Sequence, residues 1–203
     1  MDDRLRDLQN ERKNYKKVLY RYLIILSIGI NIIGVELVPI LNIPTFLNAI
    51  GTILAGVLMG PFIGTLVGFL TSIILGFFID PGYFYFTFVS ILVGFIAGYI
   101  FKEYPFNIKT VISASIFISV ITAIVGNTIS YMAFGGVAGD QIDKITHILI
   151  ESGFNIFLAV NITGFFANFL DKLLSFALVF LVIIIMDSQM DMQDFQIRWK
   201  SKL

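Results

Sequence analysis

The sequence predicts an all-α membrane protein with six transmembrane helices, both termini in the cytoplasm and an extra amphipathic outer segment before the last helix. Hydrophobic residues make up 57% of the 203 positions, and only 14% are charged, whereas roughly a quarter of the residues in soluble domains carry charge. The charges gather near the two ends of the chain and in short breaks between apolar runs. Apolar runs separated in this way are typical of polytopic helical membrane proteins.

Each predicted span is an apolar run of a length that approaches or reaches the roughly 20 residues needed to cross a bilayer. The spans are expected at about 19–37, 45–59, 62–79, 83–101, 110–134 and 168–187. Residues that disfavour helix continuation separate them. These breaks are Pro39 and Pro44, Gly60-Pro61, Asp80-Pro81-Gly82, the polar KEYPFNIK stretch and Gly135-Gly136.

The second and third spans carry glycines at every fourth position, at Gly56, Gly60, Gly64 and Gly68. Residues four apart lie on one helix face, and glycine there lets neighbouring backbones approach closely. We interpret this glycine series as helix packing, with Gly60-Pro61 forcing a very tight turn.

The stretch before the last span is less regular. Residues 140–153 place Ile142, Ile145, Ile148 and Leu149 on one face, which predicts an amphipathic helix at the membrane interface. Two interpretations of the following apolar run are possible. An outer segment at 154–167 leads into the sixth span, which we favour, or one long helix rises well above the bilayer.

Orientation follows from the excess of Lys and Arg expected on the cytoplasmic side. With six spans, twelve basic residues fall inside and two, Lys144 and Lys172, fall outside. This gives a cytoplasmic charged segment at 1–18, a membrane domain at 19–187 and a cytoplasmic tail at 188–203. The outer loops are then 38–44, 80–83 and 135–167.

Several classes of chemistry lack their sequence motifs. The chain has no cysteine, only one histidine, and no GxxxxGK[ST], HExxH or GxSxG motif, so we expect no catalysis, no cofactor and no metal site. No basic surface points to nucleic acid. The lone His147 is expected to be a plain surface residue.

Polar residues instead collect near the outer ends of the predicted spans. Because polar groups at membrane depth are costly and tend to face a cavity or one another, this clustering predicts a ligand pocket open to the outside. The residues expected to contact the ligand are Asn48, Asp80, Tyr83, Asn127, Tyr131, Asn168 and Lys172.

Five of these residues also have a structural alternative. Asp80 suits a turn, Tyr83 suits an interfacial aromatic belt, and Asn48 and Asn127 suit hydrogen bonds between helices. Lys172 either binds a carboxylate or phosphate of the ligand, or pairs with the adjacent Asp171 or with lipid headgroups.

The stretch PTFLNAIGTILAGVLMGPFIGTLVGFLTSII, followed by DPGYFYFTFVSILVGFIAGYI, resembles the substrate-binding S component of energy-coupling factor (ECF) transporters. DKLLSFALVFLVI resembles the start of that family's last helix. The resemblance implies capture of a water-soluble vitamin or precursor, and docking on a transmembrane coupling subunit with two ATPase subunits in a bacterial cell membrane. The first span departs from the family pattern, because only Ser27 and Asn31 among its small residues are four apart. The other functions considered are a membrane-embedded sensor of a bacterial signalling system and a membrane enzyme, for which no catalytic constellation is present.

Overall fold

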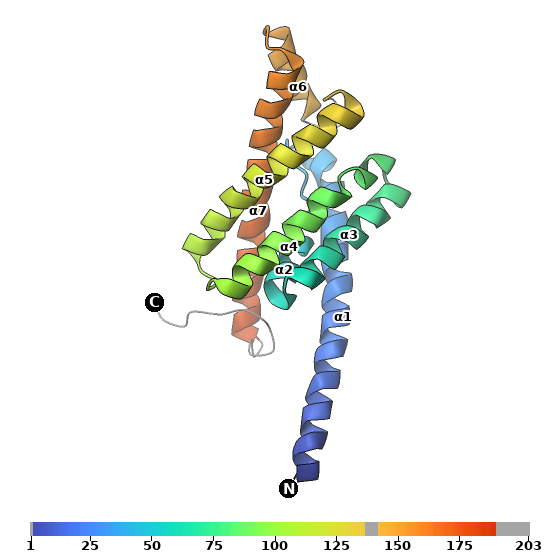
Figure 1. The fold of residues 1–203 in the computed structure, drawn as a ribbon, viewed down its shortest axis with the longest axis vertical. Helices are drawn as coiled ribbons and strands as arrows, with labels where there is room; N and C mark the ends of the chain where they lie inside the picture. Colours follow the sequence, from blue (N-terminus) through green and yellow to red (C-terminus); the bar gives the residue numbers. More distant parts are fainter. Residues whose placement is uncertain (1, 137–141, 190–203) are drawn as a thin grey trace.

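A computed structural model describes residues 2–136 and 142–189, and this part of the chain is helical without strands (Figure 1). Seven α-helices and one short 3-10 helix follow one another. They are α1 (Asp2–Leu41), α2 (Ile50–Met59), α3 (Pro61–Phe78), η1 (Pro81–Phe84), α4 (Thr87–Glu103), α5 (Ile108–Phe134), α6 (Asp143–Glu151) and α7 (Ile156–Gln189).

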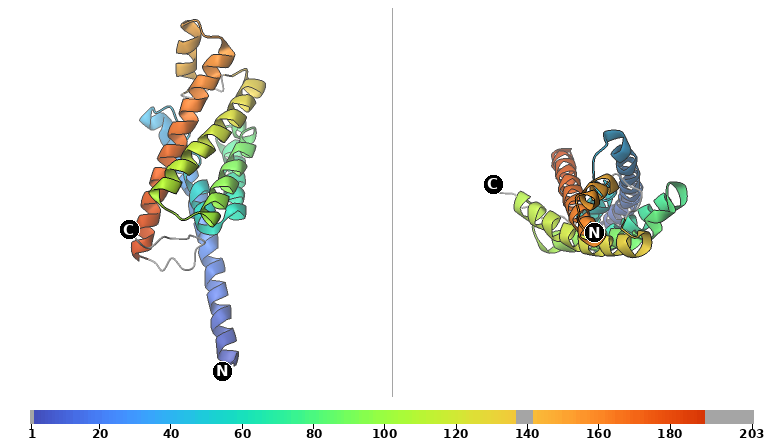
Figure 2. Two further views of the ribbon diagram at one scale, coloured as in Figure 1. Left: turned by 60° about the vertical axis from the view of Figure 1, so that its left-hand side comes forward. Right: turned by 90° about the horizontal axis from the view of Figure 1, so that it is seen from above.

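The expected all-α membrane architecture is confirmed at the level of helix content and hydropathy. Four segments are long and apolar enough to cross a membrane, namely Lys13–Leu41, Pro61–Phe78, Ile108–Phe134 and Ile156–Met186. The other two predicted spans correspond to the shorter α2 and to α4. The N-terminal half of α1 projects from one end of the bundle, and α6 lies at the opposite end (Figures 1 and 2).

The first helix is longer than predicted at both ends. It begins at Asp2, so no break separates the charged segment 1–18 from the apolar span, and it runs for 40 residues, or about 60 Å. The prediction that Pro39 stops this helix was wrong, because Pro39 lies inside it. A proline removes one backbone hydrogen bond, and few further bonds depend on a residue in the last turn, two residues before the final Leu41.

The second helix is shorter than predicted. Helix begins at Ile50 rather than near Thr45, so α2 spans only about 15 Å. Its first backbone N–H groups are satisfied by a residue of α1, because Asn31 Oδ1 accepts from Gly51 N at 2.7 Å and from Thr52 N at 3.4 Å. All ten residues of α2 are buried, and it packs against α1, α3, α4 and α7.

The glycine series is confirmed as packing between α2, α3 and α4. A Cβ on Gly64 would lie 2.6 Å from Gly94 O and 2.7 Å from Gly56 Cα, and one on Gly94 would lie 2.2 Å from Gly64 O. These distances leave no room for a side chain, so the three helices touch through their backbones. This part of the bundle is therefore a tightly packed unit.

The last helix is one long helix, as the alternative interpretation of this stretch predicted. α7 is one continuous helix of 34 residues, so the favoured division into an outer segment at 154–167 and a span at 168–187 was wrong. Asn161, Asn168, Asp171 and Lys172 do not interrupt it, because each finds a hydrogen-bond partner along or beside the helix. α5 and α6 both pack against α7.

Aromatic packing closes the end of the bundle that bears the N-terminal half of α1. Phe101 lies 5.2 Å from Phe106 and 6.0 Å from Phe176 between ring centroids, and Phe106 lies 5.5 Å from Phe180. These rings join the end of α4, the link to α5 and the second half of α7. The opposite end of the bundle holds the cavity described next.

Candidate functional site

A cavity of about 470 Å³ lies at the end of the bundle where α6 packs. Its walls come from the end of α1, the segment 42–49, the start of α2, the region from the end of α3 to the first half of α4, the second half of α5, α6 and the first half of α7. Ligand sites for small molecules commonly have volumes of roughly 300–1,000 Å³. The cavity is therefore of a size that suits one small molecule.

Six of the seven residues predicted to contact a ligand line this cavity, and one does not. The lining members are Asn48, Asp80, Tyr83, Asn127, Asn168 and Lys172. Tyr131 lies outside the cavity; its side chain is 43% exposed and its ring packs edge-on against Phe157 at 5.7 Å. On an α-helix Tyr131 falls about 40° beyond Asn127, which turns it away from the face that Asn127 and Ser130 share.

Lys172 pairs with its neighbour Asp171, and both side chains are almost fully buried, at 3% and 0% exposed. The second carboxylate oxygen, Asp171 Oδ1, accepts from Leu47 N at 2.7 Å and from the Thr45 hydroxyl at 3.3 Å. The pair thus anchors the segment 42–49 to α7. Lys172 has three N–H donors, of which one is used by Asp171, and it faces the cavity.

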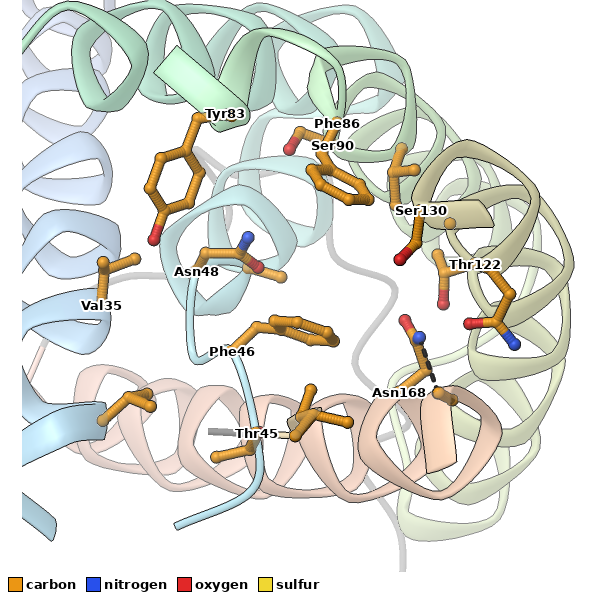
Figure 3. A pocket seen from close by; sticks show the side chains of 18 of the residues that line it. Val35, Thr45, Phe46, Asn48, Tyr83, Phe86, Ser90, Thr122, Ser130 and Asn168 are labelled. Atoms are coloured by element: carbon orange, nitrogen blue, oxygen red, sulfur yellow. Dashed lines mark hydrogen bonds between the residues drawn. The ribbon is translucent and has the colours of Figure 1, made fainter. Parts of the chain in front are cut away.

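Two asparagines present amide groups to the cavity from α5 and α7. Asn168 Nδ2 donates to Gly164 O at 2.8 Å, and this bond fixes the amide on the wall of the cavity (Figure 3). Asn127 Nδ2 reaches Asn161 O and Oδ1 at 3.4 Å, which is long for a hydrogen bond. A Cβ on Gly164 would lie only 2.0 Å from Asn127 Oδ1, so the glycine is what leaves space for this side chain.

Aromatic rings line the cavity at positions that the sequence did not single out. Phe46 and Phe86 point into the cavity from the segment 42–49 and from the start of α4, with Tyr83 beside them (Figure 3). The Phe86 ring is backed by a stacked Phe134 at 6.0 Å. Among 21 phenylalanines, no spacing distinguishes these from rings that face lipid or the core.

Hydroxyl groups of Ser90, Thr122 and Ser130 also line the cavity, and sequence reasoning missed them because small hydroxyl residues are common in membrane helices. They add hydrogen-bonding groups between the aromatic and amide walls. Such a mixture of rings, amides and hydroxyls suits a planar polar molecule.

Acidic residues contribute to the wall of the cavity. Glu36 and Asp80 line the cavity and are exposed. Asp80 also serves as the N-cap of η1, because its Oδ1 accepts from Gly82 N at 2.6 Å, so its turn role is confirmed. Within residues 2–136 and 142–189, no group of three or more His, Cys, Asp or Glu residues is placed to hold a metal ion.

Comparison with known proteins gives no relatives. No protein-family model matches the chain, and neither a curated protein nor a solved structure does so.

Proposed function

We propose that this chain is the substrate-capture subunit, or S component, of an ATP-driven ECF-type importer for a water-soluble vitamin or vitamin precursor. The observation that carries the proposal is the cavity of about 470 Å³. Polar and aromatic side chains line it inside a bundle of apolar helices, and stretches that carry the family resemblance, LNAIGT, DPGYF and DKLLSF, supply several of its walls.

The proposed topology has six spans and places the cavity on the outer side. Basic residues from Arg4 to Arg21, with Lys102 and Lys109, lie on the N-terminal half of α1 and around the α4–α5 link, at the end of the bundle away from the cavity. Because Lys and Arg are enriched on the cytoplasmic side, this distribution supports cytoplasmic termini and an outward-facing site.

The chain carries no phosphate loop, so the energy for import comes from partners. These are a transmembrane coupling subunit and two ATPase subunits in a bacterial cell membrane. The subunit itself binds and delivers its ligand without chemical change.

The decisive experiment is mass spectrometry of small molecules that co-purify with the protein, followed by titration of the identified compound. We expect saturable binding that Asn127→Ala or Lys172→Gln weakens at least tenfold. Absence of saturable binding to any water-soluble vitamin or precursor contradicts capture.

The second candidate function is the sensor module of a signalling system, which equally requires a ligand cavity. Affinity purification from native membranes separates the two functions. Co-purified ATPase subunits support import, whereas a co-purified kinase supports sensing.

A further inference from the structure

The charges that line the cavity are mostly negative. Three carboxylates line it, Glu36, Asp80 and Asp143. Lys172 is the one Lys or Arg that the described residues contribute to its wall. An anionic ligand thus depends on this single ammonium group for charge pairing.

That ammonium is already neutralised. Lys172 pairs with Asp171 Oδ2 in a site where the two side chains are 3% and 0% exposed. Charges interact strongly where water is excluded, so an anion approaching Lys172 is repelled by the carboxylate directly behind it. The donors left on Lys172 suit a neutral acceptor such as a carbonyl, hydroxyl or ring nitrogen.

The N-terminus of α2 is a further positive feature near the cavity, and it is also occupied. Helix N-termini attract anions through their unpaired N–H groups. Here Asn31 Oδ1 accepts from Gly51 N and Thr52 N, and Ile53 N bonds Ala49 O. These donors are satisfied within the protein.

We infer that the cavity selects a neutral or cationic planar compound and discriminates against carboxylated or phosphorylated ones. This inference rests on the proposed function and names the ligand class of that site. The ring lies near Phe46 and Phe86, an acceptor atom meets Lys172 or the Asn168 amide, and any positive charge faces Glu36 and Asp80. The inference reverses the expectation that Lys172 binds a carboxylate or phosphate of the ligand.

The test uses purified full-length protein in nanodiscs and pairs of compounds that share a ring but differ in charge. The pairs are riboflavin and its 5′-phosphate, pyridoxine and its 5′-phosphate, nicotinamide and nicotinate, thiamine and its monophosphate, and any co-purifying compound with its phosphorylated or carboxylated form. We expect the less anionic member of the bound pair to bind at least tenfold tighter. Tighter binding of the anionic member overturns this inference while leaving vitamin capture intact. If no water-soluble vitamin or precursor, these pairs included, binds saturably, the proposed function fails and the inference fails with it.

A second test removes one negative charge from the rim of the cavity and measures the affinity ratio within the same pair of compounds. Glu36→Gln removes one carboxylate from the exposed rim, and Glu103→Gln removes the same charge from the end of α4 away from the cavity. We expect Glu36→Gln to shift the affinity ratio within the bound pair by about two- to fivefold toward the anionic member, less at high salt. Glu103→Gln is expected to leave the ratio unchanged. An equal shift in both variants, or a shift toward the neutral member in Glu36→Gln, contradicts the inference.

Discussion

Two buried polar clusters hold the start of α2 and the segment before it, and they differ in how completely their hydrogen-bonding groups are used. In the first, the Asn31 amide accepts from two backbone N–H groups of α2 and donates to the Thr52 and Thr71 hydroxyls at 2.9 and 3.0 Å. In the second, Asp171 holds the segment through Leu47 N and Thr45, but its partner Lys172 keeps donors that face the cavity.

This difference indicates which cluster supports the fold and which cluster can bind a ligand. A buried neutral amide whose oxygen and N–H groups are all bonded within the protein contributes stability and leaves no amide group for a ligand. A buried charged pair with spare donors adds little net stability, because desolvation offsets the attraction. We therefore interpret Asn31 as structural and Lys172 as the point where a ligand enters the hydrogen-bond network.

The largest expected effect comes from breaking the charged pair on one side only. Lys172→Met leaves the buried Asp171 carboxylate without its cation, and we expect a loss of about 3–5 kcal/mol in the free energy of unfolding. Unfolding titrations in detergent micelles measure this loss. Removing both charges, in Asp171→Asn with Lys172→Met, is expected to restore most of the stability, since no unpaired charge remains.

Ligand affinity of the double variant tests whether Lys172 also contacts the ligand. The double variant is expected to stay at least tenfold weaker than the native protein, because stability returns but the donor does not. Native affinity in the double variant would show that Lys172 is only structural.

The second prediction contrasts Asn31 with Asn168. Asn31→Ala leaves two backbone N–H groups of α2 unsatisfied in a buried site, and we expect a loss of about 2–4 kcal/mol in stability. Asn168 makes one bond, to Gly164 O, so Asn168→Ala is expected to lower stability by less than about 1 kcal/mol. Its main effect is expected on ligand affinity, by about tenfold. Unfolding and binding titrations on both variants check this. The comparison would be overturned if Asn31→Ala mainly weakened ligand binding and Asn168→Ala mainly lowered stability.

The sequence predicted the parts of the fold that depend on local signals. The start of α3 at Pro61 and the left-handed glycine that ends α5, Gly135 with φ 65°, follow directly from proline and glycine. The start of α2 was missed because its cap comes from Asn31, 20 residues from Gly51. The anchoring of Leu47 by Asp171, 124 residues away, carries no local signal at all.

For the site, polarity at membrane depth was the useful signal, and it identified side chains whose burial needs an explanation, such as Asn127, Asn168 and Lys172. It could not identify Phe46 or Phe86, because an apolar ring is equally at home in lipid, core or cavity. It also could not resolve which neighbours on one helix end face inward, as the placement of Tyr131 shows.

A third prediction concerns the space beside Asn127. A methyl group at position 164 would lie 2.0 Å from Asn127 Oδ1, so Gly164→Ala is expected to displace this amide and weaken ligand binding by about tenfold, the equivalent of one hydrogen bond. The matched control is Gly29→Ala on α1, where an added Cβ meets nothing within 4 Å. We expect native affinity in the control and unchanged circular dichroism in both. Native affinity in Gly164→Ala would remove Asn127 from the site.

The smallest expected effect is at Tyr131, which tests whether the cavity as defined by its lining is the binding site. Tyr131 lies one turn beyond Asn127 on α5 but packs outward against Phe157. Tyr131→Phe keeps that ring contact and removes only the hydroxyl, so we expect ligand affinity to change by less than about twofold, well under the effect of losing a buried hydrogen bond. Isothermal titration of the variant beside Asn127→Ala makes the comparison on one helix. A loss at Tyr131 as large as that at Asn127 would mean that the ligand lies on the outer face of α5, and the cavity between α5 and α7 would no longer be the site.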